Sequence, residues 1–165
     1  EKMLSETIEK INKTAQEQFN SVFQEIRTNF QRVFGEFFKN GEADIQLHQA
    51  EDPLEGKIEI NVRPKGRALQ TLALMSGGEK TLTAISLLFA IYLVKPSPFC
   101  ILDEVDAPLD DVNIRRFTDA LQTFTDHTQF IIVTHNQRTM EAADYMYGVT
   151  QEHVGISKLV SVKFN

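Results

Sequence analysis

Cysteine and long apolar runs are scarce in this sequence of 165 residues. The single cysteine, Cys100, excludes an internal disulfide framework and a cysteine-based zinc site. No apolar run reaches the roughly 18 residues of a transmembrane helix, and the first residues show no signal-peptide pattern. Low-complexity segments are absent as well. These absences lead us to expect a soluble, cytoplasmic protein with no membrane partner.

Basic residues are also in the minority. The sequence has 17 Lys and Arg against 23 Asp and Glu, a formal net charge of −6. That balance argues against a domain whose whole surface binds nucleic acid, although it leaves room for a local basic patch. The length and the apolar content of 42% suit a single globular domain, or such a domain with one extended arm.

The N-terminal segment predicts one long helix, from about Leu4 to Phe38, because it contains no proline and its first glycine is Gly35. Its apolar residues recur about every 3.67 residues, which is an eleven-residue repeat rather than a heptad. The apolar stripe is narrow at first and widens from Phe23 on. Two interpretations fit this pattern: an ordinary amphipathic core helix, or the root of a coiled coil that leaves a globular head.

Alternating apolar and polar residues predict β-strands in two further parts of the chain, with a turn at Gly155 between the last two. A short segment from Leu69 to Leu74 follows the first pair. The strands expected on this ground are Asp44–His48, Lys57–Val62, Tyr145–Val149 and Lys158–Phe164.

The middle of the chain predicts a parallel βαβ unit. Thr81–Val94 is apolar on nearly every side, which indicates a buried helix. Phe99–Leu102 and Phe130–Val133 are continuous apolar runs, typical of fully buried strands. An amphipathic helix around Ile114–Phe124 separates them, and a short helix follows around Thr139–Ala143. The predicted fold class is therefore α/β with extra β-strands.

Polar residues follow both buried strands: Asp103 and Glu104 follow the first, and Thr134 and His135 the second. Because parallel strands end at the same edge of a sheet, we expect these groups to lie together. Four apolar residues and then two acids have the form of a Walker B element. In it Asp103 would serve Mg²⁺ and Glu104 would be the general base for a water. The alternatives are a solvated acid pair and, for His135, a satisfied core histidine.

Two consecutive glycines precede the apolar helix, in the sequence Met-Ser-Gly-Gly-Glu-Lys from Met75. Ser76 and Glu79 fit a capping box, so a well-capped helix is one interpretation. Phosphate binding by Ser76, Gly77 and Gly78 is the other, because glycines let a backbone approach a ligand and a helix N-terminus favours anions. The chain has no G-x-x-x-x-G-K-[ST] phosphate loop, so half of a nucleotide site is missing.

Taken together, these residues resemble the C-terminal half of the head domain of SMC (structural maintenance of chromosomes) proteins, of the ABC ATPase class. Three stretches carry the resemblance. MSGGEKTLTAISLLFAI is similar to the ABC signature motif, FCILDEVDAPLDD to Walker B joined to the D-loop, and QFIIVTHNQRTMEAADYMYGVT to the switch-histidine segment. Val105 stands where ABC transporters and Rad50-like repair ATPases usually have proline, and the likeness is nearest to the bacterial type.

The resemblance implies ATP and Mg²⁺ as cofactors and a role for each site residue. Ser76, Gly77 and Gly78 would contact the γ-phosphate of ATP bound to a second head. Asp110 of the D-loop would reach across the dimer interface, Asp103 would hold Mg²⁺ through water, Glu104 would be the catalytic base, and His135 would contact the γ-phosphate.

The resemblance also implies an organisation for the chain. Residues 1–24 would form the base of a coiled-coil arm, and residues 25–165 the C-terminal half of the head. Expected partners are the N-terminal half of the same head, a second head, a kleisin subunit docked near Asp44–Leu74 and the last strands, and DNA in the full-length complex.

The full protein would hydrolyse ATP to condense and segregate chromosomes in the nucleoid, and this chain alone would be inactive. The alternatives are a Rad50-like or RecN-like DNA-repair ATPase and a non-enzymatic coiled-coil scaffold.

Overall fold

The computed structural model describes residues 2–48, 56–153 and 155–163 of the chain. The helices are α1 (Lys2–Phe37), α2 (Gly77–Tyr92), α3 (Asp111–Gln122) and α4 (Gln137–Glu141), with a 3-10 turn at Leu72–Leu74. The strands are β1 (Glu42–His48), β2 (Lys57–Arg63), β3 (Gln70–Thr71), β4 (Phe99–Asp103), β5 (Gln129–Val133), β6 (Tyr145–His153) and β7 (Ile156–Lys163). Every predicted helix and strand is therefore present, with ends that move by a few residues. The predicted position Phe164 lies outside the described residues.

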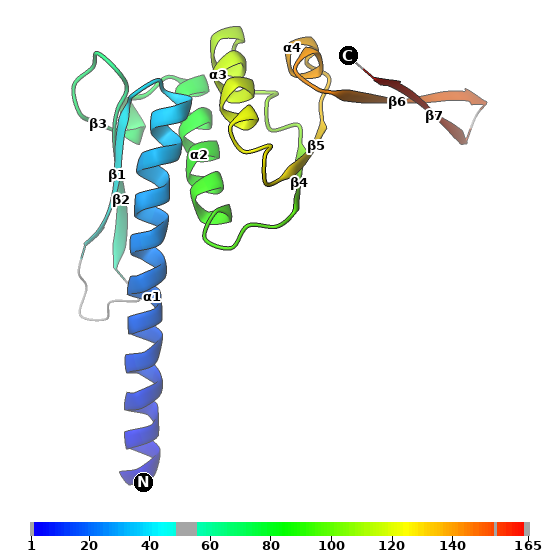
Figure 1. Cartoon of the computed structure of the whole chain (residues 1–165). Helices are drawn as coiled ribbons and strands as arrows, with labels where there is room; N and C mark the ends of the chain where they lie inside the picture. Colours follow the sequence, from blue (N-terminus) through cyan, green and yellow to red (C-terminus); the bar gives the residue numbers. More distant parts are fainter. Residues whose placement is uncertain (1, 49–55, 154, 164–165) are drawn as a thin grey trace.

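The long helix α1 is confirmed, and its two ends differ in burial. Its N-terminal part extends well beyond the rest of the molecule (Figure 1), and Ile11 is 62% exposed there. From Phe23 onwards the apolar stripe enters the core, where Phe30 and Phe37 are completely buried. The helix is thus a core helix in one part and a projecting arm in the other.

The antiparallel sheet β1-β2-β3 packs against α1, which has α2 on its other side (Figure 1). The chain turns from α1 into β1 through Lys39 and Asn40, which both have positive φ, and Gly41. A Cβ at Gly41 would lie 2.7 Å from the Phe34 ring, so only glycine lets β1 start this close to the helix. This turn holds the sheet directly against the buried phenylalanines of α1.

The parallel βαβ unit is also confirmed: β4 pairs in parallel with β5, and α3 connects them. The prediction that both strands are fully buried is wrong. Leu102 is buried, but Ile101 is 60% and Val133 is 52% exposed, because helices cover only one face of this two-stranded sheet. Helix α2 was likewise expected to be buried nearly all round, yet Leu88 and Ile91 are about half exposed. One apolar face of the β4–β5 sheet and part of the surface of α2 are therefore exposed in this chain.

The last two strands form an antiparallel hairpin, β6–β7, with Gly155 at φ +83° in its turn, as predicted. The hairpin projects away from the helices (Figure 1), and most of its side chains, such as Tyr147 and Leu159, are exposed. Among the described residues, no helix is both long and apolar enough to cross a bilayer.

Candidate functional site

The carboxyl ends of β4 and β5 bring Glu104 and His135 together, as expected from the parallel pairing. The Glu104 N–H donates to the carbonyl of Val133 at 2.9 Å, which continues the ladder by one residue beyond β4. The His135 Nδ1 atom then lies 3.9 Å from Glu104 Oε1. Both side chains are largely exposed, and so is Asp103. A carboxylate and an imidazole in this arrangement could accept a proton from a water and orient it.

Glu104 has a left-handed backbone, with φ +49°. For a residue with a Cβ this conformation costs roughly 1–2 kcal/mol, and such residues occur often at functional sites. The turn ends β4 and sets the direction of the candidate base. Nothing in the sequence signals it, because glutamate is not a residue that favours positive φ.

Asp106 is a residue of this site that the sequence analysis missed. It is 1% exposed, and its Oδ2 atom accepts hydrogen bonds from the hydroxyls of Thr134 at 2.6 Å and Thr139 at 2.5 Å. These bonds join the turn after β4 to the segment around His135. No local pattern in the sequence signals it, because both threonines lie about thirty residues further along the chain.

The fit of Mg²⁺ to this edge depends on a single carboxylate. In the described part of the chain, no three metal-ligating side chains gather closely enough to hold an ion by themselves. Mg²⁺ keeps several waters and is commonly bound through one or two carboxylates plus substrate phosphates. The exposed Asp103 carboxylate suits that mode, with the remaining ligands coming from water and nucleotide.

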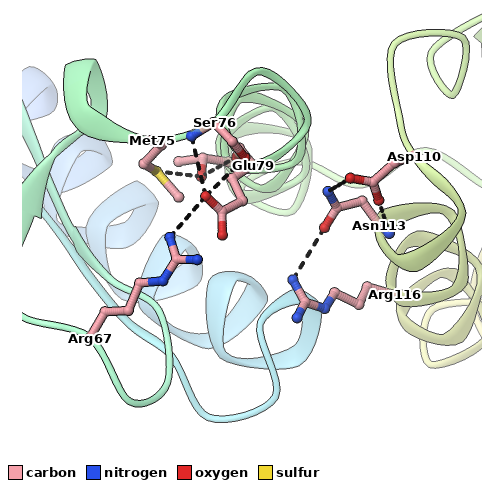
Figure 2. A network of polar contacts seen from close by, with 8 residues as sticks. Arg67, Met75, Ser76, Glu79, Asp110, Asn113 and Arg116 are labelled. Atoms are coloured by element: carbon pink, nitrogen blue, oxygen red, sulfur yellow. Dashed lines mark hydrogen bonds and ion pairs between the residues drawn. The ribbon is translucent and has the colours of Figure 1, made fainter.

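The start of α2 is organised around the Glu79 carboxylate (Figure 2). Glu79 Oε2 accepts from the Ser76 N–H at 3.2 Å and from the Ser76 hydroxyl at 3.0 Å. Arg67, from the turn after β2, donates to the same oxygen at 3.2 Å. The capping-box interpretation is therefore confirmed. It does not exclude anion binding, since the N–H groups at a helix start still favour negative charge.

The two glycines of this segment face different surroundings. A Cβ at Gly77 would meet nothing within 4 Å, whereas one at Gly78 would lie 2.8 Å from Asn113 Nδ2 and 3.4 Å from Asp110 Oδ2. Asp110 caps α3 by accepting from the Asn113 N–H at 2.8 Å, and the Asn113 amide also binds Arg116 (Figure 2). The structure thus places the predicted phosphate-binding segment next to the predicted D-loop residue, and it leaves the Gly77 backbone open.

The predicted site residues form two separate groups. One contains Ser76, Gly77, Gly78 and Asp110, and the other contains Asp103, Glu104 and His135. Across the residues that the structure describes, no hydrogen bond or ion pair directly joins a member of one group to a member of the other. Neither group resembles a complete site by itself.

A hollow of about 430 Å³ lies beside α3 and α4, and none of the predicted site residues lines it. Its lining is mainly basic, although Lys39 and Arg138 form ion pairs with Asp119 and Asp111. The lining residues are Lys39, Asp111, Val112, Arg115, Arg116 and Arg138.

Comparisons with known proteins agree on the family. A family profile described as the RecF/RecN/SMC N terminal domain matches residues 3–158. The chain is 55% identical over 165 residues to the chromosome partition protein Smc of Chlorobaculum tepidum, which covers 99% of this chain and 14% of that protein. The chain therefore spans about one seventh of the length of this relative.

Two solved structures show the same fold. One comes from work on ATP-driven dimerisation and DNA-stimulated activation of SMC ATPases. It is 37% identical, has a TM-score of 0.79, and matches over 89% of each chain. The other is the Smc head domain of Pyrococcus furiosus with an extended coiled coil, bound to the C-terminal domain of ScpA. It is 38% identical, has a TM-score of 0.79, and matches 98% of this chain and 40% of that one.

These likenesses define the architecture as the mixed α/β fold of an SMC ATPase head. The chain belongs to the RecF/RecN/SMC family, as part of the head of a protein homologous to bacterial Smc.

Proposed function

We propose that this chain is the C-terminal lobe of the head of a chromosome-organising SMC ATPase, and that it supplies the signature motif, Walker B, D-loop and switch histidine. The observation that supports this proposal is that Glu104 and His135 meet at one sheet edge, 3.9 Å apart, while Ser76 is bonded to Glu79 at the start of α2. A phosphate loop is missing from the sequence. Such a layout suits two heads that hold ATP between them. The group with Glu104 and His135 would then serve one nucleotide, and the group with Ser76 would serve the other.

In this proposal each residue acts on a defined part of the reaction. Glu104 accepts the proton of the attacking water, and His135 orients that water or donates to the γ-phosphate. Mg²⁺, held by Asp103 through water, would offset the charge of the terminal phosphates. Ser76 and the backbone at Gly77 and Gly78 donate to the γ-phosphate on the opposite head, and Asp110 lies beside them at that interface.

Hydrolysis would then control how two heads associate. The signature segment has a γ-phosphate to bind only while the nucleotide is intact, so ATP favours the paired heads and its cleavage releases them. In a full-length protein this cycle would drive chromosome condensation and segregation in the cytoplasm, on nucleoid DNA.

The open apolar face of β4–β5, together with the β6–β7 hairpin, supports a placement beside the N-terminal half of the same head. That half would contribute the missing phosphate loop. The onset of burial at Phe23 supports a division into residues 1–24, the base of a coiled-coil arm, and residues 25–165, the head lobe. A kleisin subunit related to ScpA would dock near Asp44–Leu74 and the last strands.

The test of this function is Glu104→Gln in the full-length protein. Loss of the base should lower ATP turnover by about 100-fold or more, while ATP-bound head dimers persist. Turnover and Mg-ATP-dependent cross-linking between heads measure the two effects. Glu141→Gln, an exposed glutamate of α4, is the matched control and should leave both unchanged. A Glu104→Gln protein that stays monomeric in Mg-ATP would contradict the proposed role.

A further inference from the structure

One carboxylate oxygen next to the signature serine has more donors than acceptor sites. Glu79 Oε2 receives the Ser76 N–H, the Ser76 hydroxyl and Arg67 Nη1 at 3.2, 3.0 and 3.2 Å (Figure 2). A carboxylate oxygen offers about two lone-pair sites, so the three donors share them. The Ser76 hydroxyl is the donor that is free to rotate, and it can therefore leave while the other two remain.

The charge of Glu79 lies where the proposed function brings in a phosphate. Glu79 is 9% exposed, and burial by itself would raise the pKa of its carboxyl. The hydrogen bonds from Ser76 and the nearby Arg67 charge outweigh burial, so the pKa lies below its ordinary value and the group is ionised at neutral pH. An uncompensated carboxylate at this place would repel an incoming γ-phosphate.

We propose that Arg67 is a positioning residue that acts through Glu79 on Ser76. Arg67 retains and neutralises the carboxylate, so that the Ser76 hydroxyl can turn from Glu79 to the γ-phosphate on the opposite head. The inference rests on the proposed function, and it adds a residue outside the signature motif. Arg67 comes from a separate turn, and its side chain is 56% exposed, so it can follow a small movement of the carboxylate.

Removing Arg67 has two consequences in this scheme. The buried carboxylate loses its cation, and its strongest remaining donor is the Ser76 hydroxyl, which then stays bound to it. The affinity of each head for its own nucleotide should not change, because the Arg67 side chain bonds to Glu79 at the start of α2 and, among the described residues, no hydrogen bond or ion pair joins it to Glu104 or His135.

The experiment uses the full-length protein and measures head dimerisation by cross-linking as ATP is titrated. Arg67→Ala should raise the ATP concentration for half-maximal dimerisation roughly fivefold or more, whereas Arg67→Lys, which keeps the charge, should change it less. Nucleotide binding to the unpaired head should be unaltered. Lys65→Ala removes a cation from the same turn, and in the described part of the chain no hydrogen bond or ion pair joins Lys65 to Glu79, so it should behave as wild type.

Rescue separates an electrostatic role from a merely structural one. Glu79→Gln removes the charge but keeps an acceptor oxygen for Ser76, so adding it to Arg67→Ala should restore most of the dimerisation. The inference is overturned if Arg67→Ala matches Lys65→Ala, or if Glu79→Gln gives no rescue.

Ser76→Arg tests the proposed function separately. If Ser76→Arg leaves dimerisation intact, the proposed function fails; if it blocks dimerisation while Arg67→Ala has no effect, only the inference about Arg67 fails.

Discussion

Gly77 and Gly78 are neighbours in the sequence, but we expect opposite results from their substitution. Gly78→Ala would drive a Cβ to 2.8 Å from the Asn113 amide, which is buried and hydrogen-bonded and so cannot move freely. Overpacking of this kind should lower the free energy of unfolding by about 1–2 kcal/mol. Gly77→Ala meets open space and should change it by less than about 0.5 kcal/mol. Chemical denaturation of the two variants measures the difference.

The same pair separates packing from function. If the Gly77 backbone approaches a phosphate, Gly77→Ala should weaken ATP-dependent dimerisation of the full-length protein while its stability is unchanged. Equal free energies of unfolding for the two variants would show that Gly78 is not tightly packed against Asp110 and Asn113.

Residue-level features were predictable where they follow from strand geometry, and not where they depend on distant contacts. The meeting of Glu104 and His135 followed from two parallel strands that end in polar residues. The bonds of Asp106 come from two threonines about thirty residues away, and the contact of Arg67 with Glu79 depends on where a turn places the arginine side chain. No local pattern in the sequence encodes such contacts.

At the scale of elements, α1 and β1 are joined by an ion pair. Arg27 donates to both carboxylate oxygens of Asp44, at 2.5 and 2.7 Å, and these bonds lower the pKa of Asp44 below its ordinary value of 3.8. A carboxyl with a lower pKa in the folded state stabilises the fold above its unfolded pKa. That contribution disappears as the pH falls through the folded pKa.

We therefore expect the stability of the chain to decline below about pH 5, in part through Asp44. Asp44→Asn should cost about 1 kcal/mol at pH 7, because a two-point pair that is partly exposed contributes about that much. The difference from wild type should shrink as the solution is acidified. Denaturation at several pH values measures it, with the exposed Asp126→Asn as control. A cost that stays constant from pH 7 to pH 3 would mean that the pair does not act through its charge.

The elements themselves were largely predictable, because periodicity and turn residues report on local structure. The spacing along α1 predicted its length, and the apolar runs predicted β4 and β5. Their burial was not predictable. The apolar run Phe99–Leu102 has the same pattern whether the second face of its sheet is packed by this chain or by another one. In this chain, helices cover only one face.

At the scale of the whole molecule, apolar surface is open on the β4–β5 face and along the hairpin. Exposed apolar patches of this kind mark interaction sites in soluble proteins. Phe99 is 52%, Ile101 60% and Ile131 46% exposed on one sheet, which would otherwise be an ordinary buried layer. The proposed partner for this face is the N-terminal half of the head, because it would supply both the missing cover and the missing phosphate loop.

Ile101→Glu tests that partner directly. Since Ile101 is already 60% exposed, a glutamate there should leave the folded chain within about 0.5 kcal/mol of wild type. It should nevertheless lower the affinity for a co-expressed N-terminal half by tenfold or more, because burying a charge without a partner is costly. Ile58→Glu, at a 54% exposed position on the other sheet, is the matched control and should assemble normally. Co-purification and the melting temperature of the mixture report the outcome. If Ile101→Glu assembles as well as Ile58→Glu, the N-terminal half does not pack on the open face of β4–β5.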